Sequence, residues 1–421
     1  MRIETRMRAG ATIVVSAVLL VCVVPVAQGD ELKDLRDTVD RQGALIEGLQ
    51  GEVADLKERE ATSGGAGRPA DEGENPTGVS SDYVDERIED FETAPESRFM
   101  ISGYGTAEFI GTEDAPDGFG ASFNPGFHYR MSNRLHFNGE LELELGREPG
   151  FETETEVGLE FSQIDFLLND WMVISGGYFL TPFNAFGQRL HPNWINKMAS
   201  RPILYGGQGI IPVIKQVGVM VSGGAPLCCD RSKFTYAAYA VNSPNLQGDP
   251  TLRDEALDID FTSTSNLTSD FAGGGRLAFL PIPNIEIGGS FQAGKLAGSN
   301  KRFMLVGSDF WYRWRELEIR AEYVRLSQED SNPASNGYYI QAAYRLREIF
   351  PSSESVWSLL GRVETVVRWG QIASFDPKER EQLAVGLVFW VYESAPLKFT
   401  YERNTGGVKD DRFIAQFAYG F

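Results

Sequence analysis

Residues 134–146 read "RLHFNGELELELG", and their alternation limits how the whole chain can fold. Successive side chains of a β-strand point to opposite faces, so residues of one parity share a face. One face of this segment is apolar, whereas the other is polar and rich in carboxylates. The apolar face holds Leu135, Phe137, Leu141, Leu143 and Leu145, and the polar face holds His136, Asn138, Glu140, Glu142 and Glu144.

The same alternation recurs throughout residues 97–421, where the pattern predicts about sixteen strands. In "VGLEFSQIDFLL", residues 157–168, the apolar set passes from odd to even positions, which predicts a β-bulge. We expect "VWSLLGRVETVVRW", residues 356–369, to form one continuous strand. The chain ends on "DRFIAQFAYGF", in which one face carries the aromatic residues Phe417, Tyr419 and Phe421.

The charged faces of these strands distinguish a water-filled barrel from a soluble sandwich. A sandwich buries its inner face and would have to bury many charges together; these are Glu140, Glu142, Glu156, Arg320, Glu322, Arg362, Glu364 and Arg368. Short connections also alternate with long ones, as they do in bacterial outer-membrane barrels. The sequence therefore predicts an all-β fold, an antiparallel transmembrane β-barrel with its apolar face in lipid and the terminal aromatics at a membrane interface.

Three segments precede the predicted barrel. Residues 1–29 combine a basic start with the apolar run "ATIVVSAVLLVCVVPVA", which predicts a signal peptide and export to the outer membrane. Residues 30–58 carry apolar residues at alternating steps of three and four, which predicts a short α-helical coiled coil in the periplasm. Residues 59–96 are rich in Gly, Pro and acidic residues and read as a flexible linker.

Composition excludes several classes of function. The formal net charge is -20 and the mean hydropathy is -0.24, so neither a nucleic-acid partner nor a helical membrane protein is expected. Adjacent Cys228 and Cys229 cannot form a disulfide framework. We expect no metal and no cofactor, although the loop residues Asp254, Glu255, Asp258 and Asp260 leave divalent-cation binding open as an alternative to a solvated loop.

One long connection, residues 181–212, has no acidic residue and carries four basic ones: Arg189, His191, Lys197 and Arg201. If this connection folds into the barrel, it forms a constriction lined by cations, and such a lining favours anions. The alternative is a surface loop that contacts lipopolysaccharide or a neighbouring subunit.

The predicted strands also supply charges to the barrel wall. Carboxylates come from the N-terminal strands, at Glu108, Glu140, Glu142, Glu144, Glu156 and Glu160; basic groups come from the C-terminal strands, at Arg320, Arg345, Arg362, Arg368 and Lys398. Opposed walls of opposite sign would create a transverse field across the lumen. The alternative is that neighbouring charges pair and cancel.

The stretch "GGYFLTPFNAFG", followed by "ASRPI", resembles the constriction loop of the phosphate-selective porin O and P group. The matching positions are Gly177, Phe179, Pro182, Phe183, Arg201 and Pro202. This resemblance implies a trimeric Gram-negative porin whose channel is lined by arginines. The many carboxylates expected on the wall of this chain depart from that pattern.

We therefore expect passive diffusion of small hydrophilic solutes or ions, with anions such as phosphate as candidates, through a homotrimer embedded in outer-membrane lipid, and no enzymatic activity. A barrel-anchored tether or adhesin, in contact with the cell wall through residues 30–58, is an alternative. An outer-membrane lipase or protease is another. It would need a serine and an acidic or amide partner near a histidine, and no serine pattern stands out near His136.

Overall fold

The computed structural model describes most of the chain from residue 98 onward. The described ranges are 98–113, 117–146, 154–205, 215–227, 231–247, 258–261, 268–329, 334–350, 356–373, 379–406 and 410–421. The predicted signal peptide, coiled coil and linker lie outside these ranges, as do Cys228, Cys229, Asp254 and Glu255.

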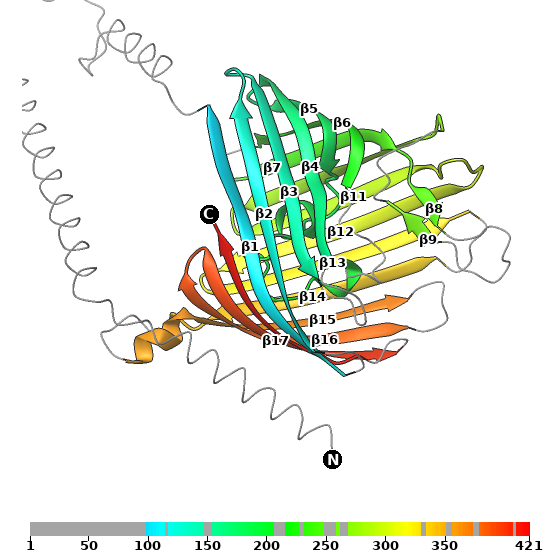
Figure 1. Cartoon of the computed structure of the whole chain (residues 1–421). Coiled ribbons are helices and arrows are strands. Elements are labelled where there is room, and N and C mark those ends of the chain that lie inside the picture. Colours follow the sequence, from blue (N-terminus) through cyan, green and yellow to red (C-terminus); the bar gives the residue numbers. More distant parts are fainter. Residues whose placement is uncertain are drawn as a thin grey trace, which may run out of the picture. The chain divides into compact units, whose positions relative to one another are not determined.

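Sixteen strands close into a single antiparallel barrel, which confirms the predicted all-β barrel of about sixteen strands (Figure 1). Their bounds are β1 Phe99–Thr112, β2 Gly118–Arg130, β3 Leu135–Gly146, β4 Glu154–Asn169, β5 Met172–Leu180, β6 Lys215–Pro226, β7 Lys233–Asn242, β10 Phe271–Ile282, β11 Ile285–Lys295, β12 Arg302–Trp314, β13 Leu317–Gln328, β14 Ser335–Arg345, β15 Val363–Ala373, β16 Arg380–Tyr392, β17 Ala395–Gly406 and β18 Arg412–Gly420. Each strand pairs with its neighbours around the barrel, with β7 next to β10.

The remaining elements are short. Strands β8 (Asn245–Gln247) and β9 (Asp258–Asp260) form a separate two-stranded sheet within the β7–β10 connection. Helix α4 (Phe186–Arg189) and the 3-10 helix η1 (Ile203–Tyr205) lie in the β5–β6 connection, and the 3-10 helix η2 (Val356–Arg362) precedes β15. Within the described ranges, no helix has the length and apolarity of a membrane span.

The end of the chain closes the barrel. Strand β18 pairs with β1, and the Phe421 amide donates to the Gly103 carbonyl at 2.9 Å while the Gly103 amide donates to the Phe421 carbonyl at 3.0 Å. The Phe421 ring stacks on Phe123 with centroids 5.7 Å apart. Phe417, Tyr419 and Phe421 all point outward and are 36–52% exposed.

Two local predictions have different outcomes. A register shift between Glu140 and Leu141 of β3, opposite Phe161 and Leu159 of β4, confirms the expected bulge. The predicted strand over residues 356–369 is too long, because residues up to Arg362 form η2 and only the part from Val363 enters the sheet.

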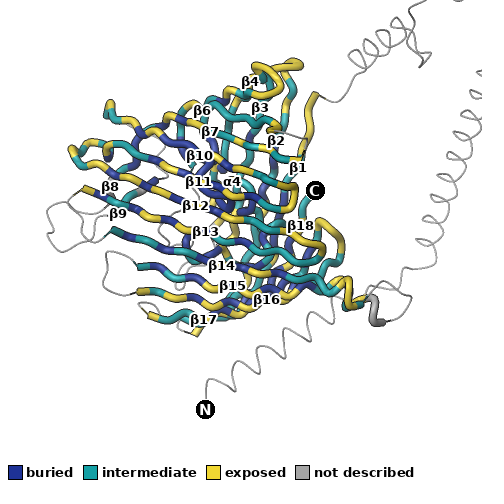
Figure 2. Tube along the Cα trace, turned by 180° about the vertical axis from the view of Figure 1, so that it is seen from behind, coloured by how far each residue is buried: buried dark blue, intermediate teal, exposed yellow. Residues whose placement is uncertain are grey.

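Outward-facing side chains are mostly large and apolar. Figure 2 shows the alternation as buried and exposed bands along β10 to β16. Examples of the exposed set are Val219, Leu277, Ile287, Phe291, Val367 and Leu387, which are 48–60% exposed. A water-facing surface would not carry so many aliphatic and aromatic groups, whereas hydrocarbon accepts them. The outside of the barrel therefore suits a membrane.

The two ends of the barrel differ in the length of their connections. Four predicted short turns are confirmed at one end, namely β4–β5, β10–β11, β12–β13 and β16–β17. The chain terminus at Phe421 lies at the same end, because β18 runs towards it. The β14–β15 connection is an exception at this end, since it is long enough to contain η2. The β5–β6 and β7–β10 connections lie at the opposite end.

Lipid contact at the outer face can be tested at Leu277 of β10, which is 60% exposed. The adjacent Arg276 points inward and is paired there with Glu286 and Asp309, so β10 already carries an arginine on its inner face. We expect Leu277→Arg to lower the free energy of unfolding in lipid vesicles by about 2–4 kcal/mol, measured by urea titration. The volume-conserving control Leu277→Met should change it by less than about 1.5 kcal/mol. Equal urea midpoints for Leu277→Arg and the parent chain would contradict a lipid-facing surface.

Candidate functional site in the barrel interior

The β5–β6 connection folds inside the barrel rather than over its surface. Its described part, residues 181–205, contains α4, which Figure 2 labels among strands β10 to β12. Its apolar side chains join a buried cluster with residues of the barrel wall. The buried members from this connection are Phe183, Ala185, Phe186, Leu190, Leu204 and Tyr205, each at most 4% exposed. Burial of this surface is a driving force that holds the connection inside.

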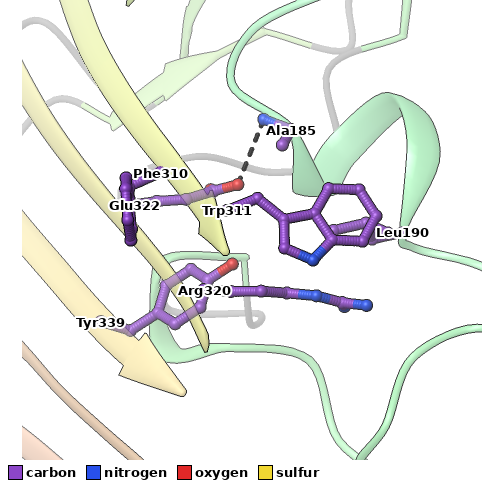
Figure 3. A pocket seen from close by; sticks show the side chains of 7 residues that line it. All are labelled: Ala185, Leu190, Phe310, Trp311, Arg320, Glu322 and Tyr339. Carbon is purple, nitrogen blue, oxygen red and sulfur yellow. Dashed lines mark hydrogen bonds between the residues drawn. The ribbon is translucent and has the colours of Figure 1, made fainter. Parts of the chain in front are cut away.

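Glu322 of β13 holds the first half of the connection. Its carboxylate accepts hydrogen bonds from the backbone amides of Ala185, at 3.1 Å, and Phe186, at 2.8 Å, and from the Tyr205 hydroxyl. Figure 3 shows Glu322 beside Trp311, Arg320 and Tyr339, with the dashed bond to Ala185. The seven side chains drawn there enclose no space for a water molecule. The carboxylate therefore binds the loop and not a ligand.

An ionic network holds Arg189, the last residue of α4. Its guanidinium binds Glu286 of β11 with two bonds, of 2.6 and 3.0 Å. Glu286 also binds Arg276 at 2.8 Å, and Arg276 binds Asp309 at 2.6 Å. Two cations and two carboxylates therefore compensate one another. Since such a network has no net charge, Arg189 adds little field to the lumen.

Two wall cations hold the second half of the connection. Arg368 of β15 donates to the carbonyls of Ser200 and Arg201, both at 3.0 Å, and lies 3.2 Å from Glu402. Lys398 of β17 donates to the Asn193 carbonyl. Both cations are 1% exposed. They serve as hydrogen-bond donors to the loop backbone, which burial has removed from water.

Carboxylates of the same wall bind the side chains of the second half. Lys197 lies 2.6 Å from Glu364 of β15, and the Ser200 hydroxyl donates to Glu402 of β17. The Ala199 amide donates to the Thr400 hydroxyl at 3.1 Å. The loop therefore lies along the strands β13 to β17 and covers their inner faces.

His191 does not supply a positive charge. Its ring is 4% exposed, and burial together with the nearby Arg201 guanidinium lowers its pKa to about 3. The ring is therefore neutral at pH 7, 3.6 Å from Glu160. Glu160 in turn pairs with Lys215 at the start of β6. The Lys215 Nζ atom also lies 3.1 Å from a carboxylate oxygen of Glu142.

Solvent reaches a different part of the interior. Five inward glutamates of β1, β3 and β4 are half-buried or exposed, in contrast to Glu160 and to the carboxylates beneath the loop; they are Glu108, Glu140, Glu142, Glu144 and Glu156, here named the acidic wall. Arg201 is the exposed basic residue of the connection, and it lies within electrostatic reach of Glu142 and Glu144. The solvent-reached interior therefore lies between the loop and the acidic wall.

Several expectations for individual residues are wrong. Arg320, Arg368 and Lys398 do not face water but lie buried beneath the loop, so these side chains form no basic wall opposite the acidic one within the described part of the chain. Glu160, also expected on the water-facing wall, is 1% exposed because it pairs with Lys215. Arg362 belongs to η2, is exposed and donates to the Val391 carbonyl at 3.3 Å. Arg345 ends β14 and pairs with Glu393 of the β16–β17 turn at 3.0 Å.

The glycine, proline and phenylalanine residues of the loop motif quoted above determine the path of the backbone and do not line the solvent-reached interior. Gly177 has φ +134°, and a Cβ there would lie 2.4 Å from the Ser162 carbonyl oxygen. Phe179 and Phe183 are 0% and 2% exposed, and Pro182 is buried. These residues direct the chain from β5 into the barrel. Of the quoted motif, Arg201 alone presents a charge to solvent.

No family model matches the chain. An uncharacterized protein of Aquifex aeolicus (strain VF5) is 23% identical over 257 residues, which cover 55% of this chain and 57% of that protein, so the chain spans little more than half of this relative. A loop-deletion mutant of OmpT, an outer membrane protein of Vibrio cholerae, has a TM-score of 0.48 at 11% identity, covering 77% of this chain and 99% of that one. A mutant porin of Rhodopseudomonas blastica has a TM-score of 0.47 at 11% identity, covering 77% and 100%.

The buried ion pair between Arg368 and Glu402 can be compared with an exposed pair on the same barrel. Replacing Arg368 by Met leaves the buried Glu402 carboxylate without its cation and removes the donor to the Arg201 carbonyl, so we expect the free energy of unfolding to fall by about 3–5 kcal/mol in a urea titration. Arg412→Met breaks the exposed pair with Asp410 and should cost less than about 1 kcal/mol. Equal losses in the two variants would show that the loop is not held by Arg368.

Proposed function

We propose that this protein is an outer-membrane channel of the porin type, through which small hydrophilic solutes diffuse passively. The observation that carries the proposal is a closed sixteen-stranded barrel, apolar outside, whose inward loop is fixed to one wall while solvent reaches the opposite one. Barrels of sixteen strands are wide enough for an aqueous channel, and an inward loop narrows it. No cofactor and no chemical step are needed for diffusion.

The charges that solvent reaches favour cations over anions in this proposal. The acidic wall offers five carboxylates, whereas Arg189 and Lys197 are paired with wall glutamates and His191 is neutral. Arg201 and the paired Lys215 are the basic groups beside the acidic wall. Side-chain charge lining a pore sets its preference, and here the excess is negative.

Phosphate selectivity has less support than the resemblance of the loop suggests. The resemblance lies in residues such as Phe179 and Phe183, which position the loop and carry no charge. A channel selective for phosphate would need several exposed cations at the narrowest point, and most of the loop and wall cations here are compensated. Export through residues 1–29, assembly as a trimer and cell-wall contact through residues 30–58 stay predictions of the sequence.

The proposal is tested by reconstituting the full mature chain in a planar lipid bilayer under a KCl gradient. We expect stepwise conductance and a reversal potential of the sign that marks cation preference. An anion-selective reversal potential would keep the channel but contradict the role of the acidic wall. Folded, heat-modifiable protein without conductance would overturn the channel itself.

Single charge changes should shift the permeability ratio in opposite directions. We expect Glu144→Gln to lower the cation-to-anion ratio and Arg201→Gln to raise it, each by about two- to fivefold, because a unit charge near a permeating ion in water is worth up to about 1 kcal/mol. The reversal potential measures both. As a control, Glu348→Gln in the exposed β14–β15 connection should leave the ratio unchanged.

A further inference from the structure

A serine, a histidine and an asparagine meet on the inner face of β1, β2 and β3. The Ser102 hydroxyl lies 2.7 Å from His128 Nε2, and His128 Nδ1 lies 2.8 Å from Asn138 Oδ1. His128 and Asn138 are opposite each other in the β2–β3 ladder, and Ser102 is opposite Gly126 in the β1–β2 ladder. The three side chains come from three strands, so no local sequence motif reveals them.

The donor and the acceptor of each hydrogen bond can be assigned by starting from Asp165, which lies at the end of this network. Asn138 Nδ2 donates to Asp165 of β4 at 2.6 Å, so its Oδ1 points to the imidazole and can only accept. A neutral His128 ring therefore carries its proton on Nδ1, and the lone pair of Nε2 then faces the Ser102 hydroxyl. Asp165 is itself held by Gln163 at 2.8 Å and Ser175 at 2.5 Å.

This is the arrangement that activates a hydroxyl for nucleophilic attack. A base within hydrogen-bond reach can remove the serine proton, and a third group holds the base in the tautomer that can do so. The carboxylate of Asp165 polarises the Asn138 amide and so stabilises the imidazolium that forms.

The site is open rather than packed. Ser102, His128, Asn138 and Asp165 are all half-buried, unlike the groups beneath the loop. Gly126, opposite Ser102 in the ladder, lets the pair approach closely, because a Cβ there would lie only 3.1 Å from Ser102 Oγ and 3.5 Å from His128 Nε2. The cluster faces the interior near the end with the short turns, so a substrate would arrive through water and not from lipid.

We infer that Ser102, His128 and Asn138 form a hydrolytic site for small water-soluble carboxylic esters that enter the barrel. Ser102 Oγ bonds to the ester carbonyl carbon while His128 Nε2 takes the hydroxyl proton. The carbon–oxygen bond to the alcohol then breaks, and Nε2 returns that proton to the leaving alkoxide. Water releases the acid from Ser102 by the same proton transfers. Ser102 and His128 are the catalytic residues, and Asn138 and Asp165 position the imidazole.

The test is covalent labelling of the full, folded chain with a fluorophosphonate, read by intact mass and by peptide mapping. We expect one label per chain, on Ser102, and none in Ser102→Ala. His128→Gln should slow labelling by about 10²-fold or more, because general base catalysis contributes at least that much. The matched control is Ser122→Ala, which removes a hydroxyl of the same hairpin that is bonded to Thr106 and has no imidazole partner.

Each outcome decides the inference. Label on Ser102 that depends on His128, with hydrolysis of p-nitrophenyl acetate lost in Ser102→Ala, supports it. No label on heat-modifiable parent protein, or equal labelling of Ser102→Ala, overturns it. The bilayer conductance of Ser102→Ala should equal that of the parent chain, so failure here is distinguishable from failure of the channel.

The positioning role of Asn138 has its own readout. Asn138→Leu removes the acceptor of the Nδ1 proton, so the two imidazole tautomers become free to exchange. We expect the kcat for p-nitrophenyl acetate to fall by about 10²-fold or more with little change in KM. A change confined to KM would mean that Asn138 only shapes the entrance.

Discussion

A charge or a backbone amide that leaves water must find a partner, and this constraint accounts for the interior of the barrel. The loop between β5 and β6 brings its backbone into a space lined by charged side chains. Glu322 accepts its amide protons, and Arg368 and Lys398 donate to its carbonyls. Without these wall groups the loop backbone would be unpaired, and without the loop the wall charges would need water. The wall groups therefore lower the energetic cost of burying the loop backbone, and the loop backbone lowers the cost of burying the wall groups.

The same constraint separates the interior into two parts with different roles. Beneath the loop, basic and acidic side chains form ion pairs and hydrogen bonds with one another and with the loop. These contacts determine the position of the loop. Along β1 to β4, the carboxylates and the cluster around His128 keep contact with solvent. The diffusion path and the hydrolytic site that we propose both use this second part. Position relative to the loop, rather than residue type, therefore decides whether a charged side chain is structural or functional.

Much of the fold follows from alternation, because the period of two is a local property that each strand carries by itself. The segment around Glu140 and the terminal aromatics already place a polar face inward and an apolar face outward. The bulge near Leu159 could also be predicted, because the apolar residues of this segment pass from odd to even positions. The start of β15 at Val363 could not be predicted, because η2 is also rich in apolar residues and neither Gly nor Pro separates the last residue of η2 from β15.

The interior is less accessible to sequence analysis, because pairing there joins residues far apart in the chain. Arg368 and Lys398 alternate correctly and were expected to face water, yet the loop from residues 181–205 covers them. Ser102 and Asn138 lie on different strands from His128, and only the register of the barrel brings them together. The interpretation of the loop as an inward constriction, rather than a surface loop, is correct about its path. It was misleading about charge, since wall carboxylates neutralise Arg189 and Lys197.

The closure of β18 on β1 limits how the loop can reach the interior. The loop contacts β15, β17 and β18, which are far from β5 and β6 in the sequence. Once Phe421 pairs with Gly103 the wall is continuous, so the loop can reach these strands only through the open end of the barrel that carries the β5–β6 connection. The ladder between β1 and β18 joins residues that are far apart in the sequence, and contacts of high sequence separation slow folding.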